Sequence, residues 1–301
     1  MAVEQAAAPI ALPVIPARPG SSEGVRGLIR RSPLGTAALC SLVLVILMAV
    51  FADYVAPFDP LEGNYSAVRR APSATHWFGT DDIGRDVLSR VIHGARISLL
   101  VGFASVFLGD LIGLSWGIAS GYIGRRFDLL SQRVLEVLFA FPGLILATML
   151  MLVLGAGLTT VIVAVAATRM PASMRIIRGV TLAVKELAYV DAARVAGAAP
   201  LRVMFCHIAP ACLAPFLIVV SAHLGIAITT EAALSFVGVG VPPPAPSWGT
   251  MLAGSAVGKF NPLWWQAVFP GMAITLTVLA MNLAGDALRD LMDPQLRRRV
   301  G

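Results

Sequence analysis

The chain has 301 residues, of which 57% are hydrophobic and only 13% are charged. Soluble globular domains carry about 25% charged residues, so this composition excludes an ordinary soluble domain and indicates a membrane protein. The formal net charge of +6 would suit nucleic-acid binding. However, no aromatic and basic platform accompanies that charge, so nucleic acid is not an expected partner.

The apolar residues are grouped in long runs, as helices that cross about 30 Å of hydrocarbon require. The alternating strands of roughly ten residues that mark a membrane β-barrel are absent. We therefore predict an all-α integral membrane protein with six transmembrane helices. They are expected at 34–55, 97–121, 131–154, 158–177, 211–234 and 267–289.

This pattern divides the chain into four parts. The predicted parts are an N-terminal tail (1–33), a first transmembrane helix with an external segment (34–96), a core of five transmembrane helices (97–292) and a basic tail (293–301). The first part is rich in Ala and Pro and lacks the basic start, apolar core and cleavage site of a signal peptide, so it is expected to be retained.

The distribution of Arg and Lys predicts the orientation. With the N-terminus in the cytoplasm, only six of the 23 basic residues fall on the other side: Arg69, Arg70, Arg85, Arg90, Arg96 and Lys259. This imbalance fits the positive-inside rule and places both termini in the cytoplasm. The segment between the fourth and fifth spans, about 178–208, is then cytoplasmic too.

An amphipathic helix is expected before the second span. Thr80 is a suitable N-cap, with Asp81 and Asp82 in the first turn and an Asp86–Arg90 pair following. Its apolar face predicts a helix on the outer leaflet that leads into the span.

Glycines spaced by four indicate close helix packing in the second span. Gly109, Gly113, Gly117 and Gly121 leave one helix face without side chains, so that another helix can approach its backbone. In the third span, Phe141-Pro142-Gly143 predicts a kink.

Polar residues within the spans have two interpretations. Asp110 lies in the second span, while His223, Thr230 and Glu231 share one helical face of the fifth. Such groups bond to a neighbouring helix or line a polar passage. Bonding between helices is favoured for His223 and Asp110, whereas both interpretations stay open for Glu231, near the outer end. The three residues of the fifth span are thus candidates for a translocation pathway.

No catalytic or metal-binding pattern is present, so we expect no enzyme, no metal site and no cofactor bound by this chain. Four scattered His and three Cys residues do not show ligand spacing.

The stretch "YVDAARVAGAAPLRVMFCHIAP" at 189–210 interrupts the apolar chain with a polar, cytoplasmic segment. A helix from about Lys185 to Val195 is expected to end at Gly197, because glycine adopts the left-handed conformation readily. Pro200 then suits the first turn of a second helix, Leu201 to His207.

This stretch resembles the cytoplasmic EAA loop of permease subunits in binding-protein-dependent ABC importers. Further stretches extend the similarity: "FGTDDIGRDVLSRVIHGARISLLVG" at 78–102, "FAFPGL" at 139–144, "EAALSFVGVGVPPPAPSWGTML" at 231–252 and "NLAGDALRDLMDPQLR" at 282–297. Over about 30–298 the chain is similar to the C-type permease subunit of dipeptide, oligopeptide and nickel transporters. It departs from the usual pattern in Asp191, where Glu is common, in Ala209, where Leu is common, and in Arg169 within a span.

The resemblance implies a type I ABC importer permease fold in a bacterial cytoplasmic (inner) membrane. It also implies a homologous B-type permease, two ATPase domains or subunits that hold ATP and Mg²⁺, and an external solute-binding protein as partners. Its substrate would be a di- or oligopeptide, with nickel or another small solute as the alternative. The implied ATPase-coupling residues are Asp191, Ala192, Ala193, Arg194, Gly197 and Pro200.

A secondary transporter driven by an ion gradient is the competing prediction. That class uses inverted repeats and broken helices with ion ligands near the membrane centre. The sequence shows no obvious repeat, so an ATP-driven importer subunit is favoured.

Overall fold

The computed structural model describes residues 33–256 and 263–292. The terminal tails, predicted at 1–33 and 293–301, therefore lie outside the described residues except for Pro33, which begins the first helix. The described part is helical, and its one β-bridge is the isolated pair Thr80–Asp86. Its longer helices are α2 (Pro33–Val50), α4 (Val87–Ile123), α5 (Arg125–Phe139), α6 (Gly143–Leu154), α7 (Leu158–Val184), α10 (Ala209–Val237) and α12 (Trp264–Met292).

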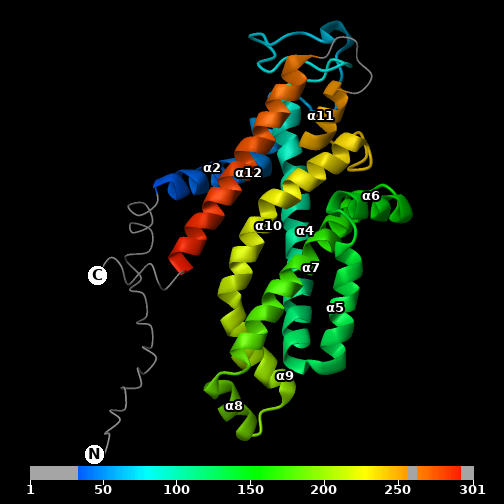
Figure 1. Ribbon diagram of the computed structural model, residues 1–301. Helices are drawn as coiled ribbons and strands as arrows, with labels where there is room; N and C mark the ends of the chain where they lie inside the picture. The colour runs from blue at the N-terminus through cyan, green and yellow to red at the C-terminus, as the bar shows by residue number, and fades with distance from the viewer. Residues whose placement is uncertain (1–32, 257–262, 293–301) are drawn as a thin grey trace, which may run out of the picture.

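Shorter elements connect these helices. They are α3 (Ala52–Val55), the 3₁₀ turn η1 (Tyr65–Ala67), α8 (Ala188–Val195), α9 (Pro200–Arg202), the π turn η2 (Val203–Ile208) and α11 (Trp248–Ala256). Figure 1 shows α4 running through the middle of the molecule. Residues 56–86, which the sequence predicts to be external and which are called the external segment below, lie with α11 at one end of the molecule, called the outer end. Helices α8 and α9 lie at the other end.

Within the described ranges, five helices are long and apolar enough to cross a membrane: α2, α4, α7, the continuous run Pro200–Val237 and α12. The predicted third span is a pair of helices, α5 and α6, that meet at an angle of 90°. The break falls at residues 140–142, because Pro142 cannot continue a hydrogen-bonded helix. Six spans result if the bent pair is one of them, as the sequence predicts.

The expected start of the amphipathic helix at Thr80 is wrong. The helix begins at Val87, and its N-cap is Asp86, whose side chain accepts a hydrogen bond from the backbone N–H of Ser89. Gly84 has a φ of +80° and lies against the backbone of Asn64, a geometry that a helix cannot contain. Residues 81–86 therefore form a turn.

The outer end of α4 also does not lie flat on a leaflet. It continues without interruption into the membrane-crossing part, and protein covers its polar face, including Asp86, Ser89 and Arg90. Asp81 and Arg85 form an ion pair, 2.6 Å apart, within the turn. The Asp86 carboxylate contacts His76 and Ser89. The Arg90 side chain pairs with Asp81 instead.

The four glycines of α4 that are spaced by four, from Gly109 to Gly121, lie against α7, which runs parallel to it. A Cβ at Gly109 would be 2.5 Å from the carbonyl oxygen of Ala166, and one at Gly117 would be 2.8 Å from that of Met174. Only glycine permits this approach, so α4 and α7 form the closely packed centre of the fold.

Candidate functional site

The most distinctive surface is the turn between α7 and α10 at the end of the molecule opposite the external segment (Figure 1). Its first helix, α8, begins at Ala188 rather than near Lys185, because residues 185–187 form a turn after α7. Its end follows the Schellman pattern: Gly197 N–H bonds to the carbonyl of Arg194, and Ala198 N–H to that of Ala193. Gly197 has a φ of +81°, as the sequence predicts.

The second short helix is not separate. Pro200 occupies the first turn of α9, but α9 passes through the π turn η2 directly into α10. The wider π turn precedes Pro210, whose ring would clash with the carbonyl four residues earlier in a regular α-helix. Pro200–Val237 is therefore one continuous helical run that includes a membrane-crossing helix.

The turn is anchored on three long helices. Val190 of α8 is fully buried in an apolar cluster with Ile118 of α4, Ile177 of α7 and Cys212 of α10. The Tyr189 hydroxyl donates a hydrogen bond of 3.1 Å to the carbonyl of His207. These contacts anchor α8 on the helix bundle.

Charged contacts strengthen this end of the bundle. Arg194 lies over the ring of Tyr122, 5.3 Å from its centroid, and forms an ion pair of 2.9 Å with Asp191. Lys185 donates a hydrogen bond to the carbonyl of Gly121, at the C-terminal end of α4, where a positive charge also opposes the helix dipole.

The remaining surface of the turn is apolar and uncovered in this chain. Val195 is 89% exposed, Leu201 66% and Phe205 62%. Asp191 and Ala192 are exposed beside them, whereas Ala193 is half-buried. An anchored, exposed, apolar surface with charged residues at its edge is typical of a docking site. The sequence analysis did not single out Val195 or Phe205, because exposure cannot be read from apolar character alone.

The polar residues of the spans occupy two buried sites between α4 and α10. Nδ1 of His223 lies 2.8 Å from Oδ1 of Asp110, and Asp110 has no exposed surface. Nearer the outer end, the Glu231 carboxyl accepts hydrogen bonds from Ser98 and Ser235. Thr230 is partly exposed, and its hydroxyl donates a hydrogen bond to the carbonyl of Ile226 in its own helix.

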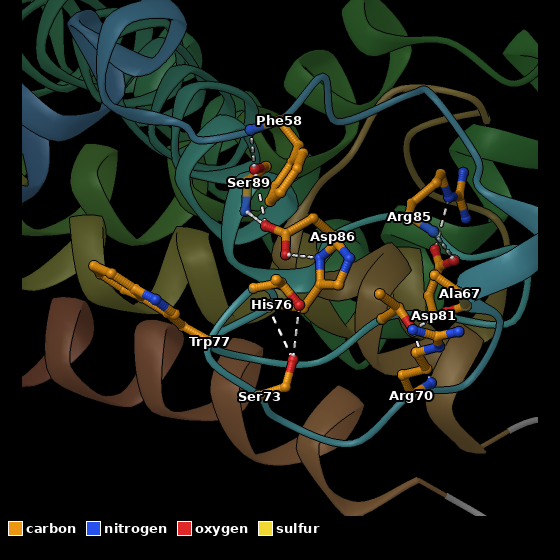
Figure 2. Close-up of polar contacts among 12 residues, drawn as sticks. Phe58, Ala67, Arg70, Ser73, His76, Trp77, Asp81, Arg85, Asp86 and Ser89 are labelled. Carbon is orange, nitrogen blue, oxygen red and sulfur yellow. Dashed lines mark hydrogen bonds and ion pairs between the residues drawn. The ribbon is translucent and has the colours of Figure 1, made fainter.

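The external segment before α4 is tied together by polar contacts, which Figure 2 shows. Asp86 accepts hydrogen bonds from both the backbone N–H and the hydroxyl of Ser89 and contacts Nδ1 of His76, while Ser89 accepts the backbone N–H of Phe58. The Thr80 hydroxyl bonds to the carbonyl of Ala67. The sequence analysis missed this network, since its members are distant in the chain.

A second contact joins the first helix to α4. Arg96 donates hydrogen bonds to the carbonyls of Ala49 and Val50, which end α2, and to both carboxyl oxygens of Asp53. Hydrogen bonds from Arg96 and His93 hold the pKa of the Asp53 carboxyl below its ordinary value.

Among the residues that the structure describes, no group of three or more His, Cys, Asp and Glu side chains could hold a metal ion.

The comparisons agree with this architecture. The family model described as "Binding-protein-dependent transport system inner membrane component" matches residues 113–298, and that described as "N-terminal TM domain of oligopeptide transport permease C" matches residues 28–72. The chain belongs to this transporter family. It is a multi-pass permease subunit, and ATP hydrolysis in such importers resides in partner subunits.

Relatives match nearly the whole chain. The glutathione transport system permease protein GsiD of Pectobacterium atrosepticum is 41% identical over 268 residues, 89% of each chain. GsiD of Escherichia coli O1:K1 is 42% identical, over 89% of this chain and 88% of the relative. The di/tripeptide transport system permease protein DppC of Pseudomonas aeruginosa is 41% identical, over 86% of this chain and 87% of the relative.

The fold matches that of a solved permease. An inward-facing structure of the MetNI methionine ABC transporter aligns with a TM-score of 0.55 and 19% sequence identity. The alignment covers 68% of this chain and 96% of that one. This likeness supports the predicted importer permease fold, whereas the sequence relatives carry the family assignment.

Proposed function

We propose that this permease forms half of the translocation pathway of an ATP-driven importer for di- and oligopeptides. The names of the relatives support a peptide-type substrate, because glutathione is itself a tripeptide and DppC carries a di/tripeptide name. A homologous B-type permease would supply the other half, and an external solute-binding protein would deliver the peptide.

The observation that carries this proposal is the anchored turn of α8 and α9. Its apolar residues are exposed, while Val190 holds it firmly on three long helices. One ATPase subunit with bound ATP and Mg²⁺ would dock on this turn. A second would dock on the B-type permease. Because α9 runs directly into α10, a displacement of the docked ATPase would rotate α10 and switch the side on which the passage opens.

Each coupling residue has a place in this mechanism. Ala192 and Ala193 are small enough to let the ATPase surface approach α8 closely. Asp191 and Arg194, which pair with each other here, would bond across the contact. Gly197 and Pro200 set the angle between α8 and α9.

The proposed orientation places this turn in the cytoplasm, together with both termini, in a bacterial inner membrane. The arginines of the turn support this orientation through the positive-inside rule. His223, Thr230 and Glu231 were predicted as pathway residues. The partly exposed Thr230 fits that role best, since the side chains of the other two point between helices of the same chain.

The test is uptake by proteoliposomes that contain the complex copurified on this chain. Dipeptides, longer peptides and Ni²⁺ are compared, with ATP and the binding protein present or absent. We expect peptide uptake that requires both additions. Uptake of Ni²⁺ alone would reassign the substrate, and uptake driven by an ion gradient without ATP would refute the proposal.

A further inference from the structure

Glu231 occupies an unusual position for a carboxyl group. It lies in α10 and has 0% of its surface exposed. Ser98 of α4 donates a hydrogen bond of 3.1 Å to one carboxyl oxygen, and Ser235 donates one of 2.8 Å to the other. A second permease can only cover more surface, so in this arrangement Glu231 does not face a passage.

Each of these two serines also accepts a backbone hydrogen bond. The Ser235 hydroxyl accepts the N–H of Val241 at 3.3 Å, and the Ser98 hydroxyl accepts the N–H of Trp248 at 3.2 Å. Val241 and Trp248 are the two ends of the sequence VPPPAPSW. Each serine hydroxyl therefore donates its proton to Glu231 and accepts a backbone N–H with a lone pair. In this way the two serines connect Glu231 to both ends of one loop.

The packing around these bonds is tight. Trp248 is fully buried, and its indole N–H donates to the carbonyl of Val91 at 2.9 Å. A Cβ at Gly249 would lie 2.7 Å from the backbone of Ala232. Water cannot enter readily to replace a lost bond, so each bond that is removed leaves a buried polar group unpaired.

We propose that Glu231 is a positioning residue that clamps the external loop 241–248, and with it the start of α11, onto α4 and α10. The loop and α11 join α10 to α12 near the outer end of the molecule (Figure 1). The clamp makes this external part move together with α10. Its consequence for transport rests on the proposed function, whereas the clamp itself does not.

The direct test is hydrogen exchange of the Val241 and Trp248 amides in the intact transporter complex. In Glu231→Gln, the carboxamide NH₂ replaces one of the two accepting oxygens. This NH₂ donates hydrogen bonds, so the serine beside it loses the acceptor for its hydroxyl proton. We expect exchange at one or both loop ends to become about 5- to 30-fold faster, as expected for a loss of one to two kcal/mol. Thr229→Ala is the matched control, because that hydroxyl donates its hydrogen bond to the carbonyl of Gly225 in its own helix.

Two serine variants make the test independent of how Glu231→Gln folds. Ser98→Ala should release Trp248 alone, and Ser235→Ala should release Val241 alone. Unchanged exchange at both amides in all three variants would overturn the clamp.

The positioning role has its own readout, the ATP hydrolysed per peptide imported by the folded complex. We expect this ratio to rise several-fold in Glu231→Gln and to stay at the wild-type value in Thr229→Ala. Faster exchange with an unchanged ratio would refute the transport role. If the wild-type complex imports no peptide, the proposed function fails while the exchange result still decides the clamp.

Discussion

His223 and Asp110 join α10 to α4 through a contact of 2.8 Å between Nδ1 and Oδ1, with the carboxylate fully buried. The two residues are 113 positions apart in the chain. Their contact has the geometry of a bond between helices, the interpretation that the sequence favours for this pair. A role in a passage makes a different prediction for variants.

If the pair serves packing, removing one partner is worse than removing both. His223→Leu removes this contact from the buried Asp110 carboxylate, which should cost roughly 1–3 kcal/mol of stability. The double variant Asp110→Leu/His223→Leu should recover much of that loss. Thermal unfolding of the purified complex measures both. Stable variants that lose transport equally would instead indicate a passage role.

The α4–α7 contact predicts a steep penalty for one added methyl group. In Gly113→Ala, the new Cβ would lie 2.7 Å from the Cβ of Ser173 and 2.9 Å from the carbonyl oxygen of Met170. Because the backbones must separate, we expect a loss of about 1–3 kcal/mol. The measurement is thermal unfolding of the detergent-solubilised complex.

Gly179 provides the matched control on α7. A Cβ there would meet nothing within 4 Å, and alanine is favoured over glycine in a helix by about 0.5–1 kcal/mol. Gly179→Ala should therefore be neutral or slightly stabilising. Equal effects of the two substitutions would contradict the assignment of the glycine stripe to helix packing.

The sequence predicted features that depend on local patterns. Apolar runs marked the spans, the spacing of four marked the glycine face of α4, and Gly197 marked the end of α8. Each depends on residues within a few turns of one another, so one sequence is sufficient. The partner of the glycine face, α7, follows from the fold and was not predicted.

Features that depend on distant residues were missed or misassigned. Thr80 has the side chain of a good N-cap, but Gly84 meets the backbone of Asn64 and prevents a helix there. Glu231 shares a helical face with His223, yet its bonding partner Ser98 lies 133 positions away. Helical periodicity indicates which side a residue occupies and not what covers that side.

The proposed coupling turn predicts that the backbone conformation of Gly197 matters more than the space around it. Its φ is +81°, and a Cβ would meet nothing within 4 Å. Valine is strongly disfavoured in this conformation, by about 1–2 kcal/mol, whereas asparagine tolerates it. Gly197→Val should insert into the membrane, copurify with less ATPase subunit and lose most ATP-dependent uptake.

Gly197→Asn is the control for this position, since it adds a side chain of comparable size without the same strain. It should retain ATPase binding and most uptake. A Gly197→Val variant that transports like the wild type would show that the angle between α8 and α9 does not determine coupling.

The contact between Asp53 and Arg96 predicts how stability changes at low pH. Hydrogen bonds from Arg96 and His93 lower the pKa of Asp53 in the folded protein, so the folded state releases this proton more readily than the unfolded state. Its stabilising contribution is complete above the ordinary Asp pKa of about 3.9 and disappears as the pH falls through the lowered value.

In Asp53→Asn this contribution is absent at every pH. The difference in unfolding temperature between the wild-type and Asp53→Asn complexes should therefore be constant from pH 7 to about pH 5 and shrink below about pH 4. Because Asp53 is exposed, added salt should reduce the difference throughout. A difference that does not change with pH would mean that the Asp53 charge does not help to hold α3 against α4.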